Sequence, residues 1–320
     1  MTWFLLTMAC IILWGVTDIL HKVSLDAEDP LSHYKTFVWI GIAMALAGGI
    51  MTTWSTTLAN SAKVLVNDLL FLFPLGIAYA AATFMGLFGK MHLDASVVSP
   101  LENIDGAMTA LIIYFYYLVT GYVHPSYSFD FLDVIGTVVI IVGVILLGSQ
   151  EQALFKKELH LEEKKKKHRF GALALFFPLI YNLMDVFSVA EIDSSVSAEG
   201  GSAIPAIDFF IFECAGFAVL ALFVWLYMLI VKKYCYFPFR EEEWLRCGAA
   251  TGETFGTMTF IMAAGINPIL TGSVTSLYCL VTILLARVFL KERLTKKQYL
   301  SLGFMVLGIA LFGLSDIFMR

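Results

Sequence analysis

Carboxylates inside long apolar segments are the residues of this chain best suited to chemistry. Glu102 and Asp105 lie three residues apart, just after Pro100, in a stretch that is otherwise mostly apolar. Side chains with this spacing share one face of a helix, and two carboxylates so close resist being ionised together. The pair is therefore predicted to bind a proton. A capped polar cluster with a structural role is the alternative.

Two aspartates occupy similar places in two other apolar segments. Asp18 follows Trp14 by four residues, and Asp185 follows Tyr181 by four. Each aspartate lies beyond the middle of its segment, by roughly 8 Å along a helix axis. We expect this pair to serve two alternating gates or a proton relay. The alternative is that Asp18 only pairs with Lys22 one helical turn on, or that either aspartate bonds to a neighbouring helix.

Two further acids complete the set of candidate substrate- or proton-binding residues. Glu253 lies between Gly252 and Gly256, a spacing that is typical of close helix packing. It is therefore expected either to face a cavity or to bond across such a contact. Glu213, in another apolar segment, is the last of the candidates.

The expected interior is negative and aromatic. Trp14, Tyr181 and Tyr278 lie at depths where they could face one cavity, and an aromatic face adds about 0.5–2 kcal/mol for a cation. The deep basic residues are expected near segment ends, where their side chains can extend to water: Lys22, Lys35, Lys90 and Arg287. We therefore expect an amine or another cation as substrate, with neutral metabolites and protons as the alternative.

Helices that cross a membrane must position these acids. The chain has 320 residues, of which 59% are hydrophobic and 15% charged, and its mean hydropathy is +0.81. A soluble domain cannot bury so apolar a composition, and in lipid a helix satisfies its own backbone hydrogen bonds. Ten segments are long and apolar enough to span a bilayer: 2–23, 32–54, 67–91, 95–120, 131–147, 170–191, 204–232, 243–265, 268–290 and 298–319. The expected fold class is an all-α integral membrane protein with ten transmembrane helices.

The two halves of the chain repeat each other. One alignment places Trp14 on Tyr181 and Asp18 on Asp185, and a second places Gly143 on Gly308. A duplicated unit of five spans has an odd number of crossings, so the second copy must be inverted, as in secondary transporters. We expect a first repeat at 1–150, a charged connection at 151–169 and an inverted second repeat at 170–320.

Basic residues suggest the orientation in the membrane. They gather in the connections at 156–169, 232–246 and 291–297. By the positive-inside rule these connections are cytoplasmic, which places both chain ends outside. The run Lys164–Lys167 is interpreted as a solvated hinge between two membrane halves, so no nucleic-acid partner is expected.

Several function classes are excluded at this stage. The chain has no Gly-x-x-x-x-Gly-Lys-[Ser/Thr] loop, so it is not expected to be an ATP-driven pump. An intramembrane aspartyl protease would need Asp18 and Asp185 around one water, whereas inverted repeats place them on opposite sides of the midplane. The five cysteines form no close pair, and His21 and His33 lie near segment ends, where they are expected to be interfacial or solvated. We expect no enzyme activity, no metal and no cofactor.

Three stretches of sequence carry a family resemblance. They are Trp14-Gly15 with Lys22 closing the first helix, the segment Ala-Ser-Val-Val-Ser-Pro-Leu at 95–101, and the run Phe-Leu-Lys-Glu-Arg-Leu-Thr at 289–295 before a glycine-spaced last helix. With these features the chain resembles the drug/metabolite transporter (DMT) superfamily, in particular its EamA-type ten-helix carriers. The first half departs from the pattern, since it reads Tyr-Val-His-Pro at 122–125 where the second half has its Lys-Glu-Arg turn.

The resemblance implies a metabolite carrier with a central cavity and alternating access. Members commonly have cytoplasmic termini, which is opposite to the orientation given by the basic residues. We expect a multi-pass protein of the cell membrane that moves a small polar metabolite or amine, with protons as the coupling ion. Its partners would be the solute, protons and the lipid bilayer. A membrane scaffold without transport is the alternative from another class.

Overall fold

Every regular element in the described part of the chain is a helix. The computed structural model describes residues 2–55, 62–92, 95–102, 205–240, 243–266, 268–291 and 294–319, together with scattered positions between 119 and 150. The helices are α1 (Thr2–Ser24), α2 (Ser32–Met51), α4 (Ala62–His92), α5 (Ala95–Glu102), α9 (Ala206–Ile230), α10 (Trp244–Ala264), α11 (Pro268–Thr275), α12 (Tyr278–Leu285), the π-helix η2 (Ala286–Leu290) and α13 (Lys296–Met319).

Four of these helices contain segments long and apolar enough to cross a membrane. They are Thr2–Ser24, Ser32–Met51, Leu72–His92 and Ala206–Ile230. The protein is thus an all-helical protein with several membrane-length apolar helices, as the composition predicts. The expected segment 170–191, the connection 151–169 and most of 103–130 lie outside the described residues. The count of ten helices and the inverted pairing of the halves stay predictions.

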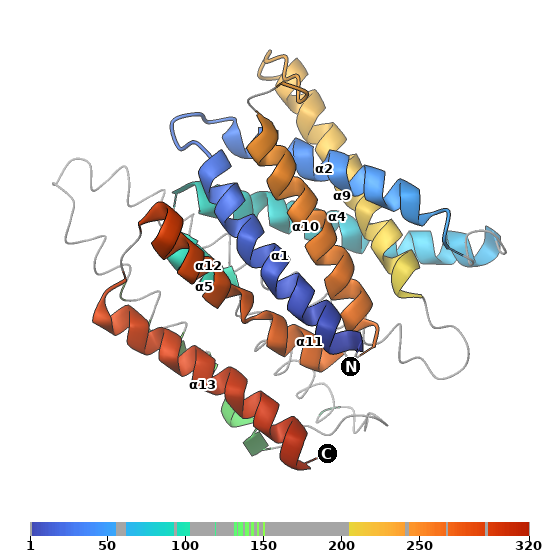
Figure 1. Ribbon diagram of the computed structural model, residues 1–320. Coiled ribbons are helices and arrows are strands. Elements are labelled where there is room, and N and C mark those ends of the chain that lie inside the picture. The colour runs from blue at the N-terminus through green and yellow to red at the C-terminus, as the bar shows by residue number, and fades with distance from the viewer. Residues whose placement is uncertain are drawn as a thin grey trace.

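Helix pairs from distant parts of the chain build the core. α1 lies along α10, while α9 packs against both α2 and α4. α12 lies beside α1 on the side away from α10, and α13 runs along the edge of the bundle (Figure 1). The start of α1 and the end of α13 lie at the same end of the molecule (Figure 1). First-half and second-half helices are therefore interleaved.

Glycines allow two of these pairs to approach closely. On α10, a Cβ at Gly256 would overlap the indole of Trp14, and a Cβ at Gly252 would overlap the Thr17 hydroxyl of α1. On α9, Gly216 lies against the backbone of Gly76 of α4. The spacing around Glu253 is therefore used for close helix packing, as this motif commonly is in membranes.

The segment 268–290 is not the continuous helix that the sequence predicts. It breaks at Ser276 and Leu277 into α11 and α12, and α12 widens into η2. Thr275 donates its hydroxyl to the carbonyl of Thr271 (2.6 Å), and the Ser276 hydroxyl donates to that of Gly272 (3.3 Å). Such side-chain bonds to preceding carbonyls bend helices, and periodicity of apolar residues does not register them. The break places Tyr278 and Thr282 opposite α1.

Candidate functional site

Lys90 lies at the centre of a buried charged cluster. Its Nζ is 2.6 Å from Oδ1 of Asp18 and 3.0 Å from Oε2 of Glu102. The side chains are 13% exposed for Lys90, 5% for Asp18 and 1% for Glu102. With Thr282, whose hydroxyl donates to Oδ2 of Asp18 at 3.0 Å, these residues form what we call the Lys90 cluster. One ammonium group thus connects α1, α4 and α5, and the hydroxyl adds α12.

This arrangement corrects one expectation. Lys90 was expected at a segment end with its charge in water, but it points inward to two carboxylates. Its position in the last turn of α4, followed directly by α5, directs it between neighbouring helices instead of toward the surface. Lys22, the partner considered for Asp18, donates from Nζ to the backbone carbonyl of Lys90 at 3.1 Å. The interior is less negative than predicted, since a buried cation offsets part of its charge.

A second buried pair lies beside the cluster, between α1 and α10. His21 Nε2 is 3.6 Å from Oε2 of Glu253, and the two side chains are 1% and 9% exposed. The expectation of a solvated His21 is therefore wrong, because α10 covers it. The distance exceeds that of a hydrogen bond but allows an ion pair if the imidazole is protonated. Asp18 and His21 lie three residues apart on α1. The carboxylates of Asp18 and Glu253 therefore both lie beside this part of α1.

Aromatic rings line the helix face one turn before Asp18. Trp14 contacts Tyr278 of α12 edge to face, with 5.5 Å between ring centroids, and Phe260 of α10 at 5.2 Å. Two of the three predicted cavity aromatics, Trp14 and Tyr278, are therefore adjacent, and Phe260 joins them. The indole Nε1 of Trp14 is buried and has no hydrogen-bond partner in the described part of the chain.

The other predicted residues are not part of this cluster. Glu213 is buried on α9, where it lines a small void of about 10 Å³ with Gly76 and Tyr79 between α4 and α9. Asp105, Asp185 and Tyr181 lie outside the described residues. The proposed carboxylate pair of Glu102 and Asp105, and the pair of Asp18 and Asp185, therefore stay predictions.

Sequence reasoning missed Lys90, Thr282, His21 and Phe260 as members of the site. The short connection between α4 and α5 was a usable signal, because neighbours joined by so few residues must be close in space. Nothing in the sequence indicated Thr282, since its contact with Asp18 joins residues 264 positions apart.

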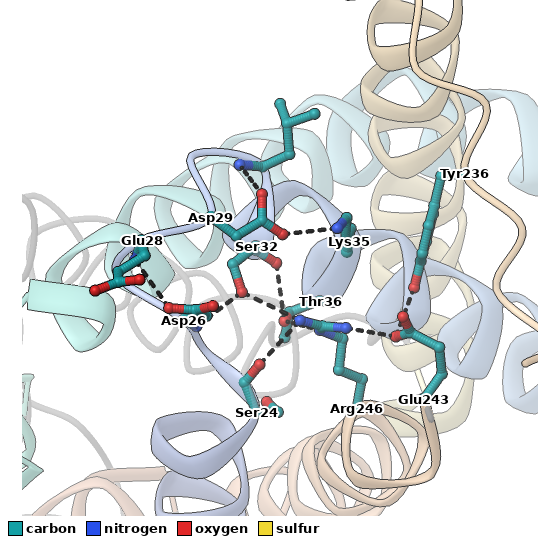
Figure 2. Close-up of polar contacts among 11 residues, drawn as sticks. Ser24, Asp26, Glu28, Asp29, Ser32, Lys35, Thr36, Tyr236, Glu243 and Arg246 are labelled. Carbon is teal, nitrogen blue, oxygen red and sulfur yellow. Dashed lines mark hydrogen bonds and ion pairs between the residues drawn. The ribbon is translucent and has the colours of Figure 1, made fainter. Parts of the chain in front are cut away.

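A second polar cluster ties three helix ends together. Figure 2 shows Arg246 reaching from the start of α10 toward the end of α1 and the start of α2. The guanidinium donates to the Ser24 carbonyl (3.0 Å), the Ser32 hydroxyl (3.2 Å) and the Thr36 hydroxyl (3.2 Å). It also pairs with Oε2 of Glu243 at 2.7 Å, to which the Tyr236 hydroxyl donates at 2.9 Å. We call these six residues the Arg246 network.

Two titrating groups at this end lie outside the membrane-spanning segments. Burial, and then the Glu243 carboxylate beside it, raise the pKa of Tyr236 above its ordinary value. For Asp29, burial acts to raise the pKa, but the Lys35 ammonium and the backbone N–H of Leu31 outweigh it, so the pKa is lowered. Asp29 Oδ2 is 2.6 Å from Nζ of Lys35 (Figure 2). These contacts order the connection between α1 and α2.

The described residues contain no group of three His, Cys, Asp or Glu side chains that could hold a metal ion. The Lys90 cluster instead offers two carboxylates on one ammonium group, with a hydroxyl beside them. Such a set can take up and release a proton, or exchange the lysine for another cation.

The chain is similar over nearly its whole length to a solved structure described as "Crystal structure of protein". The alignment covers 97% of this chain and 96% of that chain, with 16% of residues identical and a TM-score of 0.59. At this identity the likeness concerns the fold alone. Comparisons with protein-family models and with curated proteins find no match.

Proposed function

We propose that this chain is a proton-coupled secondary active transporter of the DMT superfamily, EamA type, which moves a small polar metabolite or amine by alternating access. The observation that carries the proposal is Lys90 held between Asp18 and Glu102. Charged side chains within membrane-spanning segments are costly, and they characteristically belong to ion or substrate pathways.

The charges of the Lys90 cluster favour exchange of cations. If all three groups are ionised, two carboxylates face one ammonium, which leaves an excess of one negative charge in a buried place. A proton on either carboxylate removes that excess, and so does a cationic substrate. Because both would use the same carboxylates, binding of one disfavours binding of the other. This competition is the physical basis of coupled transport.

A structural role alone is a weaker account of the cluster. Replacing a buried ion pair with apolar side chains of similar volume is often neutral or stabilising. A scaffold would therefore gain little from Asp18, Lys90 and Glu102 at this depth. The Arg246 network also suits a carrier, since it joins α1 and α2 of the first half to α10 of the second. Opening of that end would require these bonds to break.

Transport by proteoliposomes tests the proposal. The purified protein would be reconstituted with a pH-sensitive dye inside, and proton movement measured on addition of amines, amino acids, nucleosides or sugars. We expect an amine to drive proton flux in the native protein. Asp18→Asn and Glu102→Gln should each reduce this flux by at least about 100-fold, as expected for loss of a charge worth roughly 3 kcal/mol.

Glu28→Gln is the matched control, because Glu28 is an exposed carboxylate in the connection between α1 and α2. It should keep native flux. Full flux in both Asp18→Asn and Glu102→Gln would contradict the assigned site. A correctly folded native protein that moves no solute of any class, with or without a pH gradient, would favour the scaffold alternative.

A further inference from the structure

A cavity of about 530 Å³ lies apart from the Lys90 cluster, between the start of α2, the second half of α4 and the segment that follows α9. This volume is within the range of small-molecule sites, roughly 300–1,000 Å³. The lining residues that matter most are aromatic or basic: His33, Tyr34, Phe84, Phe88, Lys232 and Lys233. None of the acids of the Lys90 cluster lines it.

Aromatic rings make one wall of this cavity. The ring centroids of Tyr34 and Phe84 are 5.2 Å apart, those of His33 and Phe84 5.3 Å, and those of His33 and Phe88 5.6 Å. These rings pack on one another at tilted or edge-to-face angles, so the wall is preformed. It offers an apolar surface to an acyl chain or a ring.

The charged residues that line the cavity are positive. Lys232 and Lys233 line it and are exposed, and none of the described lining residues is acidic. Asp29, which precedes the lining residue Pro30, is already paired with Lys35 at 2.6 Å. Two ammonium groups without a carboxylate partner at this cavity favour an anion, and charge-assisted hydrogen bonds to phosphate or carboxylate are among the strongest.

His33, which was expected to be interfacial or solvated, is instead buried in the aromatic wall of the cavity. Its side chain lines the cavity, the residue is only 7% exposed, and Nδ1 has no hydrogen-bond partner among the described residues. A buried nitrogen without a partner costs about 1–3 kcal/mol. Because Nδ1 is itself covered, His33 contributes its ring to the cavity wall and not a hydrogen bond to a ligand.

The chain turns sharply at Lys233 as it leaves α9. The φ of Lys233 is 52°, in the left-handed region that glycine adopts more easily. The next residue, Tyr234, donates its N–H to the Met228 carbonyl at 2.9 Å and so turns the chain back over the end of α9. A non-glycine residue held in this conformation costs on the order of 1 kcal/mol.

We propose that this cavity binds an amphipathic anion, with its phosphate or carboxylate head on Lys232 and Lys233 and its apolar tail against Tyr34, Phe84 and Phe88. Two sources share this chemistry. One is an anionic lipid, because the positive-inside rule predicts that this end is cytoplasmic, where the leaflet is negatively charged. The other is a soluble amphipathic metabolite. The inference does not depend on the proposed transport function.

Binding to the purified full-length protein in a neutral detergent tests the proposal. The probes are phosphatidylglycerol, with phosphatidylcholine as its zwitterionic control, and the soluble n-octyl phosphate. The readouts are the shift of the melting temperature with probe concentration and the lipid adducts retained in native mass spectrometry. We expect both anions, and not phosphatidylcholine, to stabilise the native protein.

Two variants and one control make the test specific. Lys232→Gln combined with Lys233→Gly removes both charges while relieving the strained φ, so it should fold as well as the native chain. Met85→Trp fills the cavity without changing any charge. The control, Lys296→Gln with Lys297→Gln, removes two exposed lysines at the start of α13, away from the cavity.

The two cavity variants should raise the apparent Kd for both probes at least tenfold, which corresponds to about 1.4 kcal/mol, and the control should leave it unchanged. A lipid adduct that copurifies with the native protein, and is absent from the cavity variants, assigns the site to a membrane lipid. Binding of n-octyl phosphate alone assigns it to a soluble anion. Absence of binding, or an equal loss in the control, overturns the proposal.

Discussion

The Lys90 cluster and the Arg246 network are similarly buried but differ in charge. Lys90 and Arg246 are both 13% exposed as side chains. Lys90 faces two carboxylates, whereas Arg246 faces one carboxylate, two hydroxyls and a carbonyl. The Arg246 network is therefore balanced and saturated with hydrogen bonds, while the Lys90 cluster has an acid in excess. Burial alone does not distinguish a site that can exchange ions from one that fastens helices.

The largest effect is expected when the cation is removed from the cluster. Lys90→Met leaves two carboxylates buried without a counter-charge, which should lower the free energy of unfolding by about 3–5 kcal/mol. Thermal unfolding of the purified protein measures the loss. The triple variant Lys90→Met, Asp18→Asn, Glu102→Gln removes all three charges and should recover most of it. If the triple variant is no more stable than Lys90→Met, the charge imbalance is not what destabilises the single variant.

A smaller loss is expected in the balanced network. Arg246→Met takes the charged donor away from the Glu243 carboxylate and from three neutral acceptors. The free energy of unfolding should fall by about 1.5–3 kcal/mol. Arg246→Lys should recover only part, because an ammonium lacks the planar fork that reaches helices α1, α2 and α10 at once. Melting temperatures of the two variants check this. Equal stability of the lysine variant and the native protein would show that charge alone, without fork geometry, accounts for the network.

The smallest effect is expected at the exposed edge of the α1–α2 connection. The folded pKa of Asp29 is lowered, so its pairing with Lys35 contributes stability above the ordinary value of 3.8 and loses it as the pH falls through the folded value. Asp29→Asn should therefore lower stability by less than about 1 kcal/mol at neutral pH, because the pair is partly exposed.

The difference between Asp29→Asn and the native protein should disappear once the pH falls below the folded pKa of Asp29, which is lower than 3.8, because the native carboxyl is then neutral as well. Melting temperatures measured across this pH range check the sign. Comparing the stability of Lys35→Met, Asp29→Asn and the double variant separates the contribution of the ion pair from other effects of replacing Asp29. A constant difference at all pH values would mean that the ion pair is not its cause.

The sequence predicted the helices better than the site. Apolar length places α1, α2, α9 and α10 within a few residues of the expected segments. It failed at 268–290, where the helix is interrupted beside two hydroxyls that bond to preceding carbonyls, because an interruption of this kind leaves the hydropathy of the segment unchanged. It also placed Lys90 in water, since distance from a segment end says nothing about which neighbour a side chain meets.

What the sequence determined by itself is the class of protein and the presence of acids within it. Long apolar segments must become helices in lipid, and Asp18, Glu102 and Glu253 are visible inside them without any structure. Which acids share a site was decided by the tertiary structure, through the rotation of each helix about its axis and the close approach that Gly252 and Gly256 permit. The rotation and the close approach of the helices depend on contacts between residues far apart in the chain, such as Asp18 with Thr282, which no local pattern encodes.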